Sequence, residues 1–146
     1  MEQKIKVKAM CLLIQDEFVL VADGASLKSD VRLVVAKEFY RVMGGKLEFD
    51  ESSEEAVRRE IREEVGMEID KLEFLKVVEN RFTYAGERGH EIVFLYKGSP
   101  ADKLDTSKII HVVDHEYEFD AVWVPVNELL KGTRPLYPEC DYTKFI

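Results

Sequence analysis

Apolar residues fall in short runs along most of this chain, with polar turns between them. Runs of about 4 to 8 residues rich in Val, Ile and aromatic residues are typical of β-strands. They predict strands over Lys4–Ile14, Phe18–Ala22, Arg32–Met43 (one strand or two), Glu68–Tyr84 (one long strand or a pair), Glu91–Lys97 and Phe119–Val126, with a further short apolar run at Ile109–Val113. Polar residues predict turns or loops at Gln15–Glu17, Gly24–Asp30, Ala85–Gly89 and Gly98–Ser107, and Gly44–Gly45 is predicted to end the third region.

One stretch, Ser52–Val65, has a helical pattern instead. A serine at its start offers a hydroxyl cap, two glutamates occupy its first turn, and Gly66 follows its end. A second, shorter helix is predicted from Pro125 to Leu130. The order of strands and helices indicates a mixed α/β domain with a layered core.

Composition is that of one soluble domain spanning residues 1–146, since 46% of the residues are apolar, 34% are charged, and no linker or repeat interrupts them. No apolar run is long enough to cross a membrane, and no secretory signal is evident at the charged start, so we expect a cytoplasmic protein.

The two cysteines, Cys11 and Cys140, form no metal or redox motif and are expected to be free thiols. The net charge of −8 disfavours a nucleic-acid duplex as partner. A phosphate-bearing substrate would need a local cation to reverse that sign.

The predicted helix carries a stripe of carboxylates beside its apolar stripe. At about 100° per residue, Glu60, Glu63 and Glu64 fall within roughly 100° of arc on the helix. The apolar stripe next to it consists of Val57, Ile61 and Val65. Like charges at this spacing repel one another, unless they bind a cation such as Mg²⁺ or Mn²⁺. The alternative is an acidic helix surface in solvent.

The residues before the helix favour the metal-binding interpretation. Gly44 and Gly45 allow the backbone to approach a ligand closely, and a carbonyl there offers another hard oxygen. Gly45, Glu51 and the segment Arg59–Met67 have a spacing that resembles the Nudix box, and they match every fixed position of that 23-residue signature.

The resemblance extends beyond the box with less specific matches. Glu91–Phe94 is similar to the strand that follows the box in many Nudix proteins, and Trp123–Val126 followed by Asn127–Leu130 is similar to the usual last strand and helix. One departure is Met43, where many members have proline before the two glycines. The resemblance implies a Nudix-like α/β/α sandwich with a mixed β-sheet.

The resemblance also implies an activity. Nudix enzymes hydrolyse the diphosphate linkage of nucleoside diphosphate derivatives, using metal-assisted attack of water on phosphorus. Carried onto this chain, the implied metal ligands for Mg²⁺ or Mn²⁺ are Glu60, Glu63, Glu64 and the carbonyl of Gly44. Arg59 is expected to pair with Glu51 and hold the box together. Glu63 either binds the metal or orients the attacking water.

The general base has several candidates, because members of the family place it differently. Glu63 is one, Glu91 is another, and Glu116 or Glu118 in the loop before Trp123 is a third. The three histidines have no spacing typical of a zinc site.

Candidate substrate contacts lie outside the box. Tyr84 is similar in position to a tyrosine of some dinucleoside polyphosphate hydrolases, although an ordinary strand aromatic explains it as well. The cationic side chains that could meet phosphate groups are Arg32, Arg41, Lys46, Arg81 and Arg88. The expected partner is a small nucleotide, drawn from nucleoside triphosphates, nucleotide sugars or dinucleoside polyphosphates.

Two other functions fit the same fold. A nucleotide-sensing module would bind without turnover, and an isomerase of isoprenoid diphosphates would need a reactive cysteine, for which neither Cys11 nor Cys140 is well placed. A homodimer through strand edges near the N-terminus and through Lys108–Val113 is a further expectation.

Overall fold

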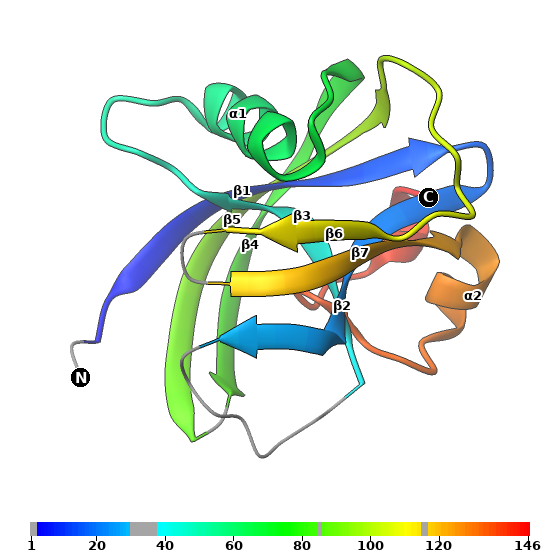
Figure 1. Cartoon of the computed structure of the whole chain (residues 1–146). Helices are drawn as coiled ribbons and strands as arrows, with labels where there is room; N and C mark the ends of the chain where they lie inside the picture. Colours follow the sequence, from blue (N-terminus) through cyan, green and yellow to red (C-terminus); the bar gives the residue numbers. More distant parts are fainter. Residues whose placement is uncertain (1–2, 30–37, 85, 115–116) are drawn as a thin grey trace.

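The computed structural model describes residues 3–29, 38–84, 86–114 and 117–146. Within them, eight strands form one mixed sheet with the order β4-β5-β1-β3-β2-β7-β6, and β8 pairs with β3 (Figure 1). The elements are β1 (Ile5–Gln15), β2 (Phe18–Ser29), β3 (Tyr40–Lys46), α1 (Ser53–Val65), β4 (Ile69–Tyr84), β5 (Glu87–Pro100), β6 (Ile110–Val113), β7 (Tyr117–Pro125), α2 (Val126–Lys131), β8 (Leu136–Tyr137) and a 3₁₀ turn, η1 (Tyr142–Lys144). The β1–β5 and β3–β8 pairs are parallel and the other pairs are antiparallel.

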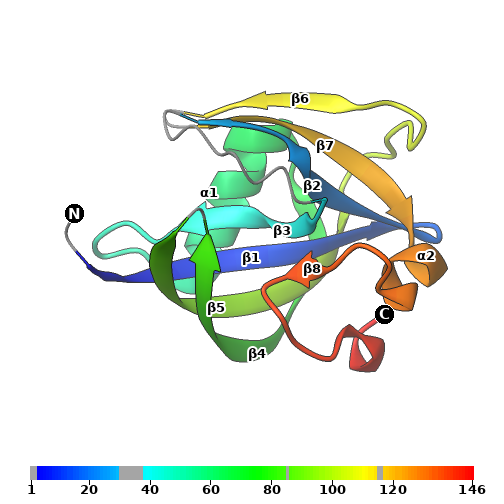
Figure 2. The ribbon, with the colours of Figure 1, turned by 90° about the horizontal axis from the view of Figure 1, so that it is seen from below.

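The sheet has a helical layer on each face, so the expected α/β/α sandwich is confirmed. Alternate residues of β1 divide between two apolar clusters: Ala9, Cys11 and Leu13 on one face, Met10 and Leu12 on the other. The first cluster contains the buried side chains of α1, and the second contains Leu129 of α2 and Tyr142 of η1. Figure 2 shows α1 on one side of β1 and β3, and α2 with the C-terminal segment on the other.

Local sequence fixes the ends of α1. The Ser52 side chain accepts a hydrogen bond from the Glu55 amide, and the Glu55 carboxylate accepts one from the Ser52 amide. Such a cap stabilises a helix by about 1 kcal/mol. Gly66 ends the helix in the left-handed conformation (φ 74°), which glycine adopts without steric cost. The predicted helix is therefore confirmed, and its apolar stripe lies on the sheet.

Several strand boundaries differ from the prediction because partner strands extend them. β2 continues through the predicted loop to Ser29, since Lys28 and Ser29 pair with β7 beyond a bulge. β3 does not stop at the two glycines but runs to Lys46 along β1. β5 begins inside the predicted turn, at Glu87, and continues to Pro100. Residues 30–37, which include the start of the strand region predicted over Arg32–Met43, lie outside the described part of the chain.

The predicted edge near the N-terminus is wrong, because β1 is a central strand with β5 on one side and β3 on the other. The edges of the sheet are β4 and β6, so Ile110–Val113, within the predicted Lys108–Val113 region, is an edge strand. In the part of the chain described, no helix has both the length and the apolar character needed to span a bilayer.

Candidate functional site

Three carboxylates meet where α1 faces the end of β6. Glu60 and Glu64 lie one turn apart on α1, and Asp114 directly follows β6. One oxygen from each lies within 4.8 Å of the others. We call Glu60, Glu64 and Asp114 the acidic cluster. Its donors are all carboxylate oxygens, which hard divalent cations such as Mg²⁺ prefer.

Glu64 is the member of the acidic cluster with the least internal compensation. Burial raises the pKa of Glu64 to about 8; nearby Arg41 opposes this rise, while the charges of Glu60 and Asp114 add to it. Its buried Oε1 has no hydrogen-bond partner among the described residues. A buried carboxylate oxygen without a partner carries a desolvation penalty. A bound divalent cation would remove both the penalty and the mutual repulsion, so the donor set fits such a cation.

Glu60 lies against the backbone of β3. A Cβ atom added to Gly45 would lie 2.5 Å from the Glu60 carboxyl carbon, which is far closer than real Cβ contacts. Gly45 is therefore needed for close approach. Burial raises the pKa of Glu60, and Arg59 opposes that rise through a hydrogen bond. The Glu60 side chain is 12% exposed.

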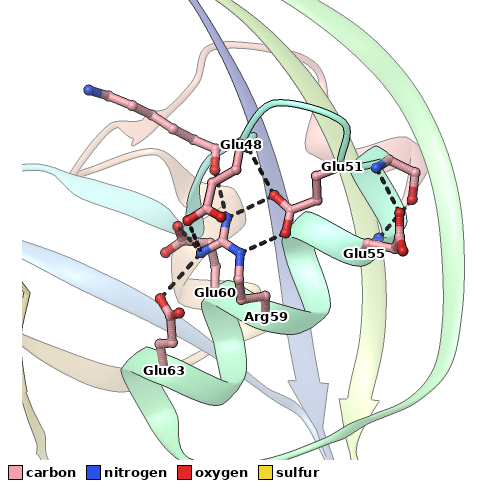
Figure 3. A network of polar contacts seen from close by, with 8 residues as sticks. Glu48, Glu51, Glu55, Arg59, Glu60 and Glu63 are labelled. Atoms are coloured by element: carbon pink, nitrogen blue, oxygen red, sulfur yellow. Dashed lines mark hydrogen bonds and ion pairs between the residues drawn. The ribbon is translucent and has the colours of Figure 1, made fainter.

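Arg59 ties the loop before α1 to the helix, as Figure 3 shows. Its Nε and Nη2 donate to the two oxygens of Glu51 at 2.7 and 2.9 Å, and Nη2 also donates to the Lys46 carbonyl at 3.0 Å. Its Nη1 donates to Glu60 at 3.0 Å and to Glu63 at 3.2 Å. These hydrogen bonds hold the pKa of Glu51 down at about 2. The expected pairing of Arg59 with Glu51 is confirmed.

A positively charged side chain, that of Arg41 on β3, lies beside the acidic cluster. The Arg41 guanidinium of β3 stacks over the Phe119 ring, 5.5 Å from its centroid. Its buried Nε has no hydrogen-bond partner among the described residues. Arg41 is therefore the candidate substrate contact that lies close enough to act electrostatically on Glu64.

Comparison with known proteins identifies the family. The Nudix domain family model matches residues 4–140 of this chain. The chain belongs to the Nudix hydrolase family. Solved structures similar to it include a MutT Nudix hydrolase from Burkholderia pseudomallei, with TM-score 0.58 and 23% identity over 93% of this chain and 92% of that one. Others are the mutator MutT protein of Bacillus halodurans, with TM-score 0.60 and 19% identity over 87% and 72%, and the E. coli ORF135 protein, with TM-score 0.54 and 25% identity over 93% and 83%. At these identities the structures support the fold.

Glu63 and Lys46 lie near the acidic cluster of this Nudix hydrolase without joining it. The Glu63 side chain is 60% exposed and points to Arg59. The Lys46 side chain is exposed, while its carbonyl accepts the hydrogen bond from Arg59. Gly44 lies next to Gly45 on β3, so the predicted carbonyl ligand belongs to the same stretch of backbone.

The other predicted site residues lie elsewhere. Glu91 is buried on the face away from α1, where Lys8 and Asn80 contact it. Arg81 lines a cavity beside the N-terminal residues of β1. Glu118 accepts a hydrogen bond from His111 if that nitrogen is protonated. Tyr84 lies at the end of β4. Arg32 and Glu116 fall outside the described residues.

Asp114 is the member of the acidic cluster that sequence reasoning missed. The sequence predicts candidates just after it, Glu116 and Glu118, but not the acidic residue that directly follows the short apolar run Ile109–Val113. An acidic residue at the end of a predicted strand was the available signal. Its position opposite α1 depends on the long-range pairing of β6 with β7 at the sheet edge.

Proposed function

We propose that this Nudix hydrolase cleaves the diphosphate linkage of a nucleoside diphosphate derivative, and that Glu60, Glu64 and Asp114 hold the Mg²⁺ or Mn²⁺ that the reaction needs. The observation that carries the proposal is the buried Glu64 oxygen that has no hydrogen-bond partner among the described residues, beside two further carboxylates. A fold made only for stability would pair or expose such a group. The Gly44 carbonyl is an additional proposed ligand.

The cation, when bound, would neutralise phosphate oxygens and lower the pKa of a water molecule. The chain's own residues supply positioning. Arg59 holds Glu60 on one side and Glu51 on the other, so the loop before α1 keeps a fixed position relative to the acidic cluster. Phosphoryl transfer depends mainly on such positioning and on charge compensation.

Arg41 and Glu63 have the two remaining proposed roles. Arg41 lies beside Glu64, and its Nε donates to no group in the described part of the chain, so we assign Arg41 to a phosphate oxygen of the substrate. Glu63 is the general base in this proposal, because it is the predicted candidate that borders the acidic cluster, bonded to the same Arg59 as Glu60. Glu91 is left with a structural role because Lys8 pairs with it on the opposite face. A cytoplasmic location and a homodimer stay predictions from the sequence.

A substrate screen tests the proposal. Nucleoside triphosphates, nucleotide sugars, ADP-ribose and dinucleoside polyphosphates are incubated with the full chain in Mg²⁺, in Mn²⁺ and in EDTA. We expect cleavage of at least one class with either metal and none in EDTA. Tight nucleotide binding without cleavage in any metal would instead support a sensing module and overturn the proposed activity.

A further inference from the structure

A basic cavity lies apart from the acidic cluster, between the N-terminal residues of the chain and the β4–β5 hairpin. Its volume is about 350 Å³. Four side chains that are cationic or can become so line it: Lys4, Arg81, Arg88 and His90. They come from three neighbouring segments, so the basic character arises from the fold and not from one run of charged residues. We call this site the basic cavity.

Strand register brings three of these side chains, those of Arg81, Arg88 and His90, to one face of the sheet. Arg81 of β4 is directly opposite His90 of β5, and His90 is paired with Ile5 of β1. Arg88 lies two residues from His90, so it projects to the same side. Ile5 is an even number of residues from Ala9, which packs with α1. The basic cavity therefore opens on the face that carries α1.

Neither arginine of the basic cavity is neutralised by an ion pair with a described residue. Within the described residues, ion pairs join other arginines to carboxylates: Arg58 to Glu54, Arg59 to Glu51, Arg62 to Glu68, and Arg134 to Asp23. Arg81 and Arg88 form no ion pair within the described residues, although the protein has a net charge of −8. Grouped cations repel one another, so an arrangement that gathers them is favoured when an anion binds.

The basic cavity is distinct from the acidic cluster. Ala9 pairs with Gly45, and Gly45 contacts Glu60. Ile5, which lines the basic cavity, is four residues farther along β1, or about 13 Å at the rise of a β-strand. An anion in the basic cavity would thus lie well outside the coordination sphere of a cation held by Glu60.

We propose that the basic cavity is a second anion site, in which Arg81 and Arg88 bind a multiply charged phosphate group. Guanidinium groups suit phosphate because they donate parallel hydrogen bonds to two oxygens. The phosphate group belongs either to the far end of a long substrate or to a separate polyphosphate.

Binding of inorganic tripolyphosphate to the full chain in EDTA tests the site, because without metal the acidic cluster repels this anion. Calorimetry should show salt-dependent binding that weakens at least about tenfold in R81Q/R88Q. The control K76Q/K108Q removes the same charge from exposed positions elsewhere and should bind as the unchanged protein does. Both variants should keep the melting temperature. No binding, or equal weakening in the control, overturns the proposal, and neither result depends on whether the acidic cluster is catalytic.

Kinetics with metal then distinguish the two sources of phosphate. If the site holds the far end of the substrate, R81Q/R88Q raises KM for dinucleoside polyphosphates and leaves KM for nucleotide sugars unchanged. If it holds a separate polyphosphate, tripolyphosphate alters turnover of a nucleotide sugar in the unchanged protein but not in R81Q/R88Q.

Discussion

Half-buried Glu64, on α1, and buried Glu91, on β5, lie on opposite sides of the same sheet, and their carboxylates have opposite surroundings. The Glu91 carboxylate is 2.5 Å from the Lys8 ammonium group and accepts a hydrogen bond from Asn80 at 3.3 Å. Glu64 is crowded by two other carboxylates, and one of its oxygens has no partner within the described residues.

The difference teaches how a structural charge and a site charge can be told apart. Burial lowers the pKa of Lys8, while the charge of Glu91 and a hydrogen bond to it oppose that shift. The pair therefore compensates itself inside the protein. Arg41 compensates Glu64 only in part, since burial still raises the pKa of Glu64 to about 8. Glu91 has its counter-charge, Lys8, inside the protein. We therefore expect an external cation at Glu64 and none at Glu91.

The largest expected effect is on turnover when Glu64 is neutralised. E64Q keeps the shape of the side chain but loses the charge that holds the cation, so kcat/KM should fall by about 100-fold or more. The control is E54Q, at an exposed position in the first turn of the same helix, which should retain full turnover. Metal-dependent turnover that survives E64Q would show that the acidic cluster is not the site.

The second effect is on stability and separates the two glutamates by its sign. E91Q leaves Lys8 buried without its counter-charge, so the free energy of unfolding should fall by about 3–5 kcal/mol. In E64Q, measured without metal, the repulsion among the three carboxylates is relieved. The free energy of unfolding of this variant should therefore not fall. Urea unfolding of both variants in EDTA gives the comparison. The double variant K8M/E91L removes both charges and should recover much of the loss, whereas no recovery would mean that packing alone explains E91Q.

A third variant pair separates steric displacement from backbone strain. In G45A the new methyl group overlaps the Glu60 carboxylate, so turnover should fall by roughly 10- to 100-fold as that ligand moves. In G66A the methyl group meets nothing within 4 Å, but the residue keeps a φ of 74°. That conformation should lower stability by about 1–2 kcal/mol with turnover per folded molecule retained. Equal losses of turnover in the two variants would contradict the role given to Gly45.

The smallest expected effect is on the pH dependence of stability and concerns Glu51. Like Glu91, Glu51 pairs with a positively charged side chain of the protein, in this case Arg59, but it lies near the surface. Its pKa is lowered from 4.5 to about 2 by hydrogen bonds from Arg59. A carboxyl with a lowered pKa contributes stability that is present above pH 4.5 and is lost as the pH falls toward 2. Thermal melts should show a shallower loss of stability across this range in E51Q. An identical pH profile in E51Q would mean that the pairing adds nothing measurable.

Local chemistry made part of this molecule predictable. The capping serine, Gly66 and the helical period define α1 without reference to the rest of the chain. The spacing of Glu51 and Arg59 predicts their contact because a short loop and two helical turns separate them.

Contacts between distant segments were not predictable in the same way. Lys8 meets Glu91 because β1 and β5 pair in parallel, although 83 residues separate the two side chains. Asp114 reaches Glu60 and Glu64 because β6 is an edge strand beside β7. No local pattern encodes these pairings, so the sequence identified two members of the acidic cluster and missed the third.

The most direct test of the account is a calorimetric titration of Mn²⁺ into the metal-free full chain, compared with E64Q and E91Q. We expect a binding isotherm for the unchanged protein and for folded E91Q, and no isotherm for E64Q. Saturating Mn²⁺, at about 100 times the Kd, should also stabilise the unchanged protein by about 2.7 kcal/mol. Equal Mn²⁺ binding by E64Q and the unchanged protein would contradict the claim that Glu64 is left open for a cation.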